Sequence, residues 1–348
     1  MLKNKWIYLI VVVVAVAALA GALFWYFNSD QNDYVAKVGD VKITTAEYQI
    51  ILHTVKSQLE QYALGNTPDP TAVKDFWAGK LGDQSAETYA KNLALDNAKD
   101  FKIRLLKAKQ LNYSIDKATL DKLNSDLDKQ IQSFGTTAEA SIKDRYGVSV
   151  KDYRAFIVDF TLAYTVLTDK ETKKITTTDA EIKKYYDDNK SKLENVTVRH
   201  ILFSTSDATG KAIPAAQQAE VKKTATDIMN KIKSGSDMAA LAKKYSADPG
   251  SKDNGGLLSP FGRGAMVKPF EDWAFSAKVG DIGLVKSDYG YHVMRLEGKK
   301  STYDELKDTA KTALINKKFS DIIAAWGKEK QFALTKNQKV LDSIKVNG

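Results

Sequence analysis

The chain has 348 residues, of which 43% are hydrophobic and 27% are charged, which is enough for about two domains with apolar cores and argues against disorder along its whole length. It contains no cysteine, which excludes disulfide bonds, zinc sites with thiolate ligands and catalysis by a thiol nucleophile. The formal charge of +9 is spread over segments rich in both lysine and aspartate, so we expect solvated basic faces and no nucleic-acid partner.

The N-terminal segment is apolar. From Trp6 to Phe27 there is no charged residue, and that length matches the ~20 residues with which a helix crosses a bilayer. Lys3 and Lys5 precede the segment and Asp30 follows it, which predicts that the N-terminus is cytoplasmic and that the rest of the chain lies outside. We therefore expect residues 1–28 to form a single-pass membrane anchor.

A cleaved signal peptide is the alternative for this segment, because residues 18–20 (Ala-Leu-Ala) have the small-x-small pattern of a cleavage site. Cleavage there would leave the aromatic residues 23–27 at a very apolar new terminus, so we favour the uncleaved anchor. Residues 19–21 also resemble the start of a bacterial lipoprotein box, but Ala22 stands where the lipidated cysteine would be. Both alternatives export the chain, and its positive charge would then attract anionic surfaces such as acidic lipid or a cell wall.

Residues 29–194 are predicted to form a mostly helical domain that begins with a strand and turn at residues 33–43. Thr44 and Glu47 then have the spacing of a capping box at the start of a helix. His53 lies outside the apolar stripe of that helix, and we interpret it as a surface or rim histidine.

Further helices follow a loop at residues 65–70, where Gly, Asn and Pro predict turns. Helical periodicity returns near Ser85, Ser149 is the expected N-cap of a later helix, and Thr178 with Glu181 repeats the capping signature. Helices with one apolar face are not stable alone, so these faces must pack against one another or against a partner.

The next segment, residues 195–299, is predicted to have the order β-α-α-α-β-β, with a short additional strand around residues 257–261. We expect the main strands at residues 196–203, 283–286 and 291–297, and the helices at 214–233, at 235–245 and from Pro269 onward.

Two of the three histidines bracket this segment, in Arg199-His200-Ile201-Leu202-Phe203 and in Gly290-Tyr291-His292. Between them lie a Gly-Gly-x-Leu run at residues 255–258 and a Gly-x-Met-x-x-x-Phe-Glu helix start at residues 264–271. Together these motifs resemble the parvulin family of peptidyl-prolyl cis/trans isomerases. The resemblance implies a small antiparallel sheet with surrounding helices, an α+β class for the chain, catalysis of rotation about X-Pro bonds, and no cofactor or metal.

By this resemblance, Leu257, Met266 and Phe270 correspond to the pocket for the proline ring, and Phe261 would support its floor. Each of these residues taken alone is more often plain core packing, but the intact spacing of the motif favours the pocket.

His200 and His292 correspond to the paired histidines beneath the reacting peptide bond, and we expect them to shape the site because the reaction moves no proton. Asp248 stands where family members carry cysteine or aspartate, so covalent catalysis is excluded. Its carboxylate would weaken amide resonance; a turn cap before Pro249 is the alternative. Ser287 and Tyr289 are expected to line the site, with a surface position as the alternative for Tyr289. The loop after the first strand has no basic cluster, so we expect no specificity for phosphoserine.

The order of anchor, helical region, parvulin module and terminal helix is similar to the extracytoplasmic foldases of the PrsA and SurA type. In those proteins the regions before and after the isomerase form one chaperone-like domain. We therefore expect residues 300–348, with a helical pattern from Tyr303 to Trp326, to complete the domain of residues 29–194.

This resemblance implies a bacterial protein of the cell membrane that assists unfolded or partly folded exported proteins with X-Pro bonds. A holdase chaperone without isomerase activity is the alternative. Whether the helical domain forms a homodimer stays open.

Overall fold

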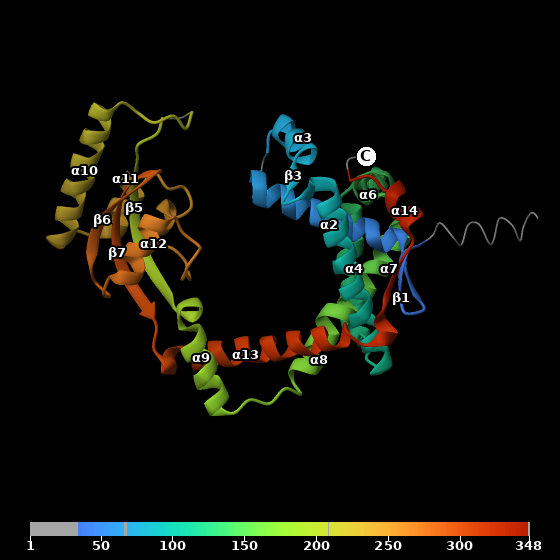
Figure 1. Ribbon diagram of the computed structural model, residues 1–348. Helices are drawn as coiled ribbons and strands as arrows, with labels where there is room; N and C mark the ends of the chain where they lie inside the picture. The colour runs from blue at the N-terminus through green and yellow to red at the C-terminus, as the bar shows by residue number, and fades with distance from the viewer. Residues whose placement is uncertain (1–33, 66–67, 208, 347–348) are drawn as a thin grey trace, which may run out of the picture. The chain divides into compact units, whose positions relative to one another are not determined.

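The computed structural model describes residues 34–65, 68–207 and 209–346, and these residues divide into two compact units (Figure 1). Unit 1 contains the described residues up to Ile175 and those from Lys318 onward, and unit 2 is Thr176–Lys317. The division falls inside helix α13 (Tyr303–Trp326), so unit 2 extends beyond the expected isomerase domain of residues 195–299 at both ends.

No helix in the described part of the chain is both long and apolar enough to cross a membrane. The expected anchor over residues 1–28 lies outside the described residues.

Unit 1 is mostly helical, with a three-stranded sheet of order β2-β1-β8 and a two-stranded sheet of β3 and β4. Its strands are β1 (Tyr34–Val38), β2 (Val41–Thr44), β3 (Lys80–Leu81), β4 (Gln84–Ser85) and β8 (Leu334–Lys336). Its helices are α2 (Thr45–Leu64), α3 (Pro70–Ala78), α4 (Ala86–Gln110), α5 (Lys117–Gln132), α6 (Ala138–Tyr146), α7 (Val150–Phe160), α8 (Leu167–Thr172) and α14 (Gln338–Ser343). A π-helical turn, η2 (Thr161–Val166), joins α7 to α8, and the short 3-10 turns are η1 (Gly135–Thr137) and η4 (Lys330–Phe332).

The start of α2 is held by the predicted capping box, which is confirmed. The Thr44 hydroxyl accepts the Glu47 N–H at 3.1 Å, and the Glu47 carboxylate accepts the Thr44 N–H at 2.8 Å. The same carboxylate binds the ammonium of Lys102 on α4 at 2.6 Å, and Lys102 is buried. One glutamate therefore caps α2 and ties it to α4.

The C-terminal residues complete unit 1. Strand β8 pairs antiparallel with β1, with Lys336 opposite Ala36 and Leu334 opposite Val38. Apolar side chains of this segment, including Phe332, belong to the same core as α2 and α4. Neither β8 nor α14 is predicted by the sequence, because elements this short contain too few residues to show a period.

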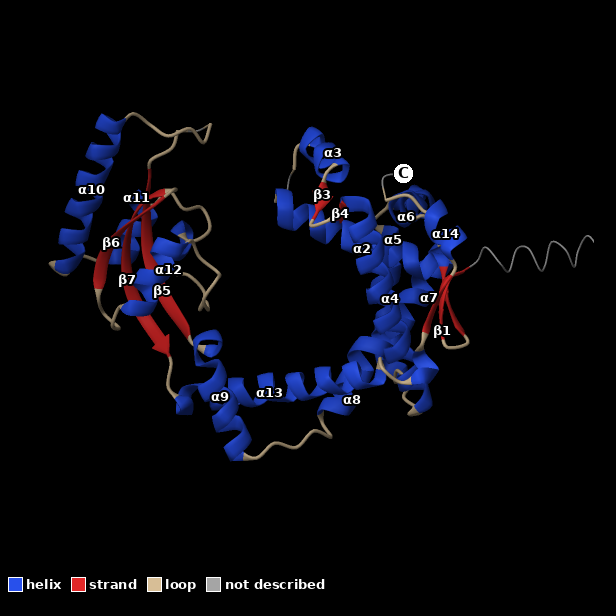
Figure 2. Cartoon of the chain, in the orientation of Figure 1, coloured by secondary structure: helices blue, strands red, loops and turns tan. Residues whose placement is uncertain are grey.

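Unit 2 contains an antiparallel sheet of order β5-β7-β6, with helices on both faces (Figure 2). Its strands are β5 (Asn195–Ser204), β6 (Ile282–Ser287) and β7 (Gly290–Lys300). Its helices are α9 (Asp179–Leu193), α10 (Ala215–Lys233), α11 (Met238–Tyr245), α12 (Lys268–Ser276) and the first part of α13, with the 3-10 turn η3 (Lys252–Asn254). The mixture of helices and antiparallel sheet agrees with the expected α+β class.

The three expected main strands and the helix start at Pro269 are confirmed in unit 2. The short strand expected around residues 257–261 appears as two isolated bridges, from Phe261 to Val196 and from Leu257 to Arg199.

The two faces of the unit 2 sheet carry separate apolar cores because side chains alternate along each strand. On one face, Ile201 of β5 and Val293 of β7 pack with α10 and α11. On the other, Val198 and Met294 pack with Phe270 of α12. A third cluster joins α9 to the first part of α13.

Candidate active site

Two histidines lie on the α12 face of the unit 2 sheet. In the register of β5 and β7, Leu202 is opposite His292 and His200 is opposite Met294, so the two imidazoles are diagonal neighbours on one face. Their Nδ1 atoms are 3.3 Å apart, and each of the two residues is only 5% exposed. The structure thus brings together the two histidines that bracket this segment in the sequence.

An apolar cluster covers this histidine pair. The ring of Phe270 meets both imidazoles edge-on, with centroids 5.4 Å from His200 and 5.3 Å from His292. Phe261 lies 6.1 Å from Phe270 and is buried, and Met266 packs half-buried against the same cluster. The side chains of Phe261, Met266 and Phe270 thus form an apolar wall beside the polar histidine pair.

Leu257 is placed differently from its sequence expectation. It is half-buried and does not belong to the cluster, whereas its neighbour Leu258 packs against it. Successive residues of an extended segment point to opposite sides, and the Leu258 N–H is bonded to the Val198 carbonyl at 2.9 Å. The leucine that packs against the same cluster as Met266 is therefore Leu258.

Asp248 reaches the pair from the loop after α11. Its Oδ2 lies 2.9 Å from Nε2 of His200 and also accepts a hydrogen bond from Ser251, whose Oγ is 3.0 Å from the same Nε2. Its Oδ1 accepts the Gly250 N–H at 3.1 Å. Asp248 therefore both caps this turn and contacts the histidine. Ser251 is not among the predicted site residues, although its position three residues after Asp248 is a turn-forming spacing.

The loop that carries Asp248 is fixed to β5 at His200 and at Leu202. The Ala247 N–H donates to the Leu202 carbonyl at 2.8 Å, and the His200 N–H donates to the Gly256 carbonyl at 2.8 Å. A Cβ on Gly256 would lie 2.2 Å from the His200 carbonyl oxygen, and the φ of +79° also favours glycine. The second glycine of the Gly-Gly pair is thus required for this close approach.

The charge state of Asp248 follows from its contacts. Burial raises the pKa of the carboxyl, but hydrogen bonds from Ser251, His200 and the Gly250 N–H outweigh burial and hold the pKa below its ordinary value. Asp248 is therefore ionised at neutral pH and can only accept hydrogen bonds.

Both histidines are neutral at neutral pH. Burial lowers the pKa of His200, and the hydrogen bond and charge of Asp248 offset only part of this effect. Burial also lowers the pKa of His292, to about 4, with the neighbouring His200 adding to the shift and Asp248 opposing it.

An ionised Asp248 and two neutral imidazoles allow one order of donors. Nε2 of His200 donates to Asp248, so its Nδ1 is an acceptor and His292 must donate from its own Nδ1. Nε2 of His292 then accepts from the Ser287 hydroxyl at 2.7 Å, and Ser251 also donates to Asp248. The five side chains form one directed chain of hydrogen bonds.

Tyr289 is expected from the sequence to line the site, but its side chain takes no part in this hydrogen-bond network. Its backbone N–H donates to the Ser287 Oγ at 3.2 Å, but the side chain is 61% exposed. The site therefore combines an apolar wall with a polar network whose only formal charge is the Asp248 carboxylate.

Comparison with known proteins identifies relatives for both units. A family model described as a PPIC-type PPIASE domain matches residues 180–300, and one described as a SurA-like N-terminal domain matches residues 1–134. "Foldase protein PrsA" of Caldanaerobacter subterraneus subsp. tengcongensis is 35% identical over 321 residues, which is 90% of this chain and 90% of that protein. "Foldase protein PrsA 4" of Bacillus cereus is 37% identical over 197 residues, 56% of this chain and 59% of that protein. The crystal structure of PrsA from Bacillus subtilis aligns with 27% identity and a TM-score of 0.31, over 74% of this chain and 84% of that one.

The directed network predicts opposite tautomers for the two histidines. At pH 7 we expect ¹⁵N chemical shifts to report a proton on Nε2 of His200 and on Nδ1 of His292. In an Asp248→Asn chain the amide can donate or accept, so we expect the preference at His200 to weaken and the pKa values of both histidines to fall. The same tautomer in both rings of the unsubstituted protein would contradict the network.

The lowered histidine pKa values predict that unit 2 loses stability in mild acid. His292 has its ordinary pKa of 6.5 in the unfolded chain and a pKa of about 4 in the folded chain. At a pH between these two values the unfolded chain therefore binds more protons than the folded chain. The free energy of unfolding should therefore fall as the pH falls from 6.5 to 4, by roughly 3 kcal/mol from His292 alone. Urea unfolding followed by tryptophan fluorescence measures this change, and Trp273 is the tryptophan that contributes the signal of unit 2. A His292→Asn chain should show a smaller slope, and an equal slope in both would rule out this origin.

Proposed function

The chain belongs to the family of PrsA foldases, and on that premise we propose a peptidyl-prolyl cis/trans isomerase and chaperone that assists the folding of exported proteins. The observation that carries this function is the apolar wall of α12 and its neighbours beside a neutral pair of buried histidines. Rotation about an X-Pro bond crosses a barrier of ~18–20 kcal/mol and breaks no covalent bond. A site for this reaction must hold the ring and favour the twisted amide.

Met266, Phe270 and Leu258 hold the proline ring in this proposal, with Phe261 behind Phe270. The half-buried Met266 and Leu258 leave apolar surface for a ligand, and the flexible thioether adapts to a flat ring. Leu258 takes the role expected of Leu257, because it is the leucine that belongs to this cluster.

Asp248 acts electrostatically in this proposal. Resonance in the planar amide places negative charge on the carbonyl oxygen, and that form is disfavoured next to an ionised carboxylate. The twisted amide has a neutral carbonyl and is therefore favoured relative to the planar one. His200, His292 and Ser287 keep this carboxylate oriented and need no proton transfer. We call them positioning residues for this reason.

The proline contacts predict the effect of one truncation. Met266→Ala should lower the catalysed rate of proline-limited refolding of a model protein by at least about tenfold, because it removes the thioether that contacts the ring. The measurement compares refolding rates with the full chain and its variants at equal concentration. Met229→Ala is the matched control, because Met229 is also half-buried but packs on the opposite face of the sheet. Equal losses in both variants would contradict a proline pocket at Met266.

A holdase without isomerase activity is the second candidate, and the SurA-like match over residues 1–134 favours a chaperone role for unit 1. The double variant Met266→Ala, His292→Ala separates the two functions. If isomerase activity is lost while suppression of client aggregation persists, the chain has both. If the unsubstituted protein does not accelerate proline-limited refolding at all, only the holdase function remains.

We further propose that residues 1–28 anchor the protein in the membrane of a bacterial cell, with the bulk outside. The uncharged run from Trp6 to Phe27 and the lysines before it support this orientation. We expect the full-length mass in the membrane fraction after a high-salt wash. A mature chain that starts after Ala20 would establish the signal-peptide alternative instead.

A further inference from the structure

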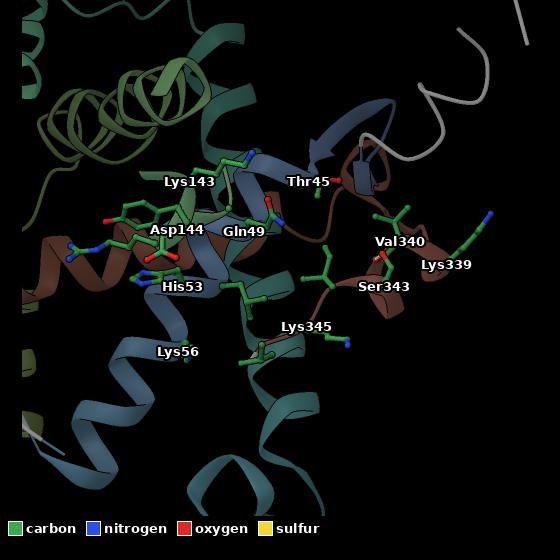
Figure 3. A pocket seen from close by; sticks show the side chains of 16 residues that line it. Thr45, Gln49, His53, Lys56, Lys143, Asp144, Lys339, Val340, Ser343 and Lys345 are labelled. Atoms are coloured by element: carbon green, nitrogen blue, oxygen red, sulfur yellow. Dashed lines mark hydrogen bonds between the residues drawn. The ribbon is translucent and has the colours of Figure 1, made fainter. Parts of the chain in front are cut away.

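A hollow of about 930 Å³, which we call the basic hollow, lies in unit 1, far in sequence from the isomerase motifs. It is lined by α2, by the end of α6 with Gly147, and by the segment from Lys339 to Val346 at and after α14. Figure 3 shows His53 and Asp144 on one side of this basic hollow, Ser343 and Lys345 on the other, and Gln49 between them. Three separate parts of the chain thus build it.

Positive charge dominates the basic hollow. Its lining contains five cationic side chains and one carboxylate, Asp144; the cations are Lys56, Lys143, Arg145, Lys339 and Lys345. Within residues 34–65, 68–207 and 209–346, none of the five forms an ion pair with a carboxylate. Elsewhere in unit 1 lysines do find acidic partners, as Lys117 does with Asp121. The hollow therefore presents uncompensated positive charge.

The basic hollow also has apolar lining. Leu52 of α2 and Val340, Ile344 and Val346 of the C-terminal segment contribute to it, and all four side chains are largely buried. The lining of the basic hollow therefore combines aliphatic side chains with cations.

One histidine reports the local electrostatic potential. The imidazole of His53 meets the ring of Tyr146 edge-on at 4.7 Å. Burial lowers the pKa of His53, and the charges of Arg145 and Lys56 lower it further, while Glu60 opposes them. These neighbours include both α2 and α6, so the positive field at His53 comes from more than its own helix.

We propose that the basic hollow binds an extended acidic segment of a partner protein, with carboxylates against Lys56, Arg145 and Lys345 and an aliphatic side chain against Leu52. A polyphosphate has no apolar groups to place there, and a lipid surface is flat and needs no concave lining. A peptide that combines acidic and aliphatic side chains matches both parts of the surface. This site goes beyond the isomerase site and gives unit 1 a selectivity of its own.

The probe for this proposal is a short labelled peptide in which glutamate alternates with leucine and which contains no proline. We expect the full chain to bind it, measured by fluorescence anisotropy, and to bind the matching glutamine-leucine peptide far more weakly. The triple variant Lys56→Gln, Arg145→Gln, Lys345→Gln should weaken binding of the acidic peptide about tenfold, since three exposed ion pairs are lost.

A variant of equal net charge tests whether the position of the charges matters. Lys80, Lys151 and Lys170 are exposed lysines of unit 1 outside the hollow, and their triple replacement by glutamine should leave peptide affinity within about twofold of the unsubstituted chain. Equal weakening by both triple variants would overturn the proposal, because it would show attraction by net charge alone. It would also be overturned if inorganic polyphosphate or vesicles with anionic lipid bound at the hollow and the acidic peptide did not.

The pKa of His53 reports on binding in the unsubstituted chain, so this measurement does not depend on whether the variants fold. A bound anion should raise the pKa of His53, measured by NMR in the unsubstituted chain with and without the acidic peptide, and leave His200 and His292 unchanged. An unchanged pKa of His53 at saturating peptide would place the peptide elsewhere and overturn the site. Isomerase activity on a short X-Pro peptide, assayed in the same variants, separates failure of this proposal from failure of the proposed function.

Discussion

The negative charge of Asp248 is the constraint on which the site depends. An ionised carboxylate cannot donate, so it determines where each proton lies in turn on His200, His292 and Ser287. A buried network in which every member has a partner selects one side-chain arrangement, whereas a partly satisfied one is costly. The two imidazoles are thereby held as a fixed support for the edge-on ring of Phe270. The shape of the apolar wall therefore depends on a charge at the far end of the network.

The backbone brings that charge to the right strand. Ala247 and Gly256, at the two ends of the loop, bond to Leu202 and His200 of β5, so the carboxylate is carried by a loop with little freedom along the strand. Strand alternation then supplies the second histidine, because His292 and His200 share a face in the β5–β7 register. Backbone pairing positions the network, and the network in turn orients the side chains that meet the ring.

The sequence was most informative where structure is local. Capping at Thr44, the helix start at Pro269 and the alternation of β5 depend on residues a few positions apart, and all are present. The choice between Leu257 and Leu258 depended on which face a short extended segment turns toward the core, and only its pairing with β5 decides that. Ser251 belongs to the site because it contacts His200, which lies in another element. Strand β8 forms because it pairs with β1, from which most of the chain separates it. Such long-range contacts leave no period in the sequence.

The proposed sites of the two units differ in their charge. In unit 2 the histidines are neutral, and the loop after β5 has its Asp207 carboxylate occupied by the backbone N–H groups of Thr209 and Lys211. The histidine network contains no cation, so the proposed isomerase site would select its ligands through the apolar grip on proline. In unit 1, five cations that have no carboxylate partner among the described residues line the hollow at His53. Under the two proposals, unit 1 recognises charge and unit 2 recognises proline, so changes in client charge should alter capture by unit 1 without altering the intrinsic isomerisation step in unit 2.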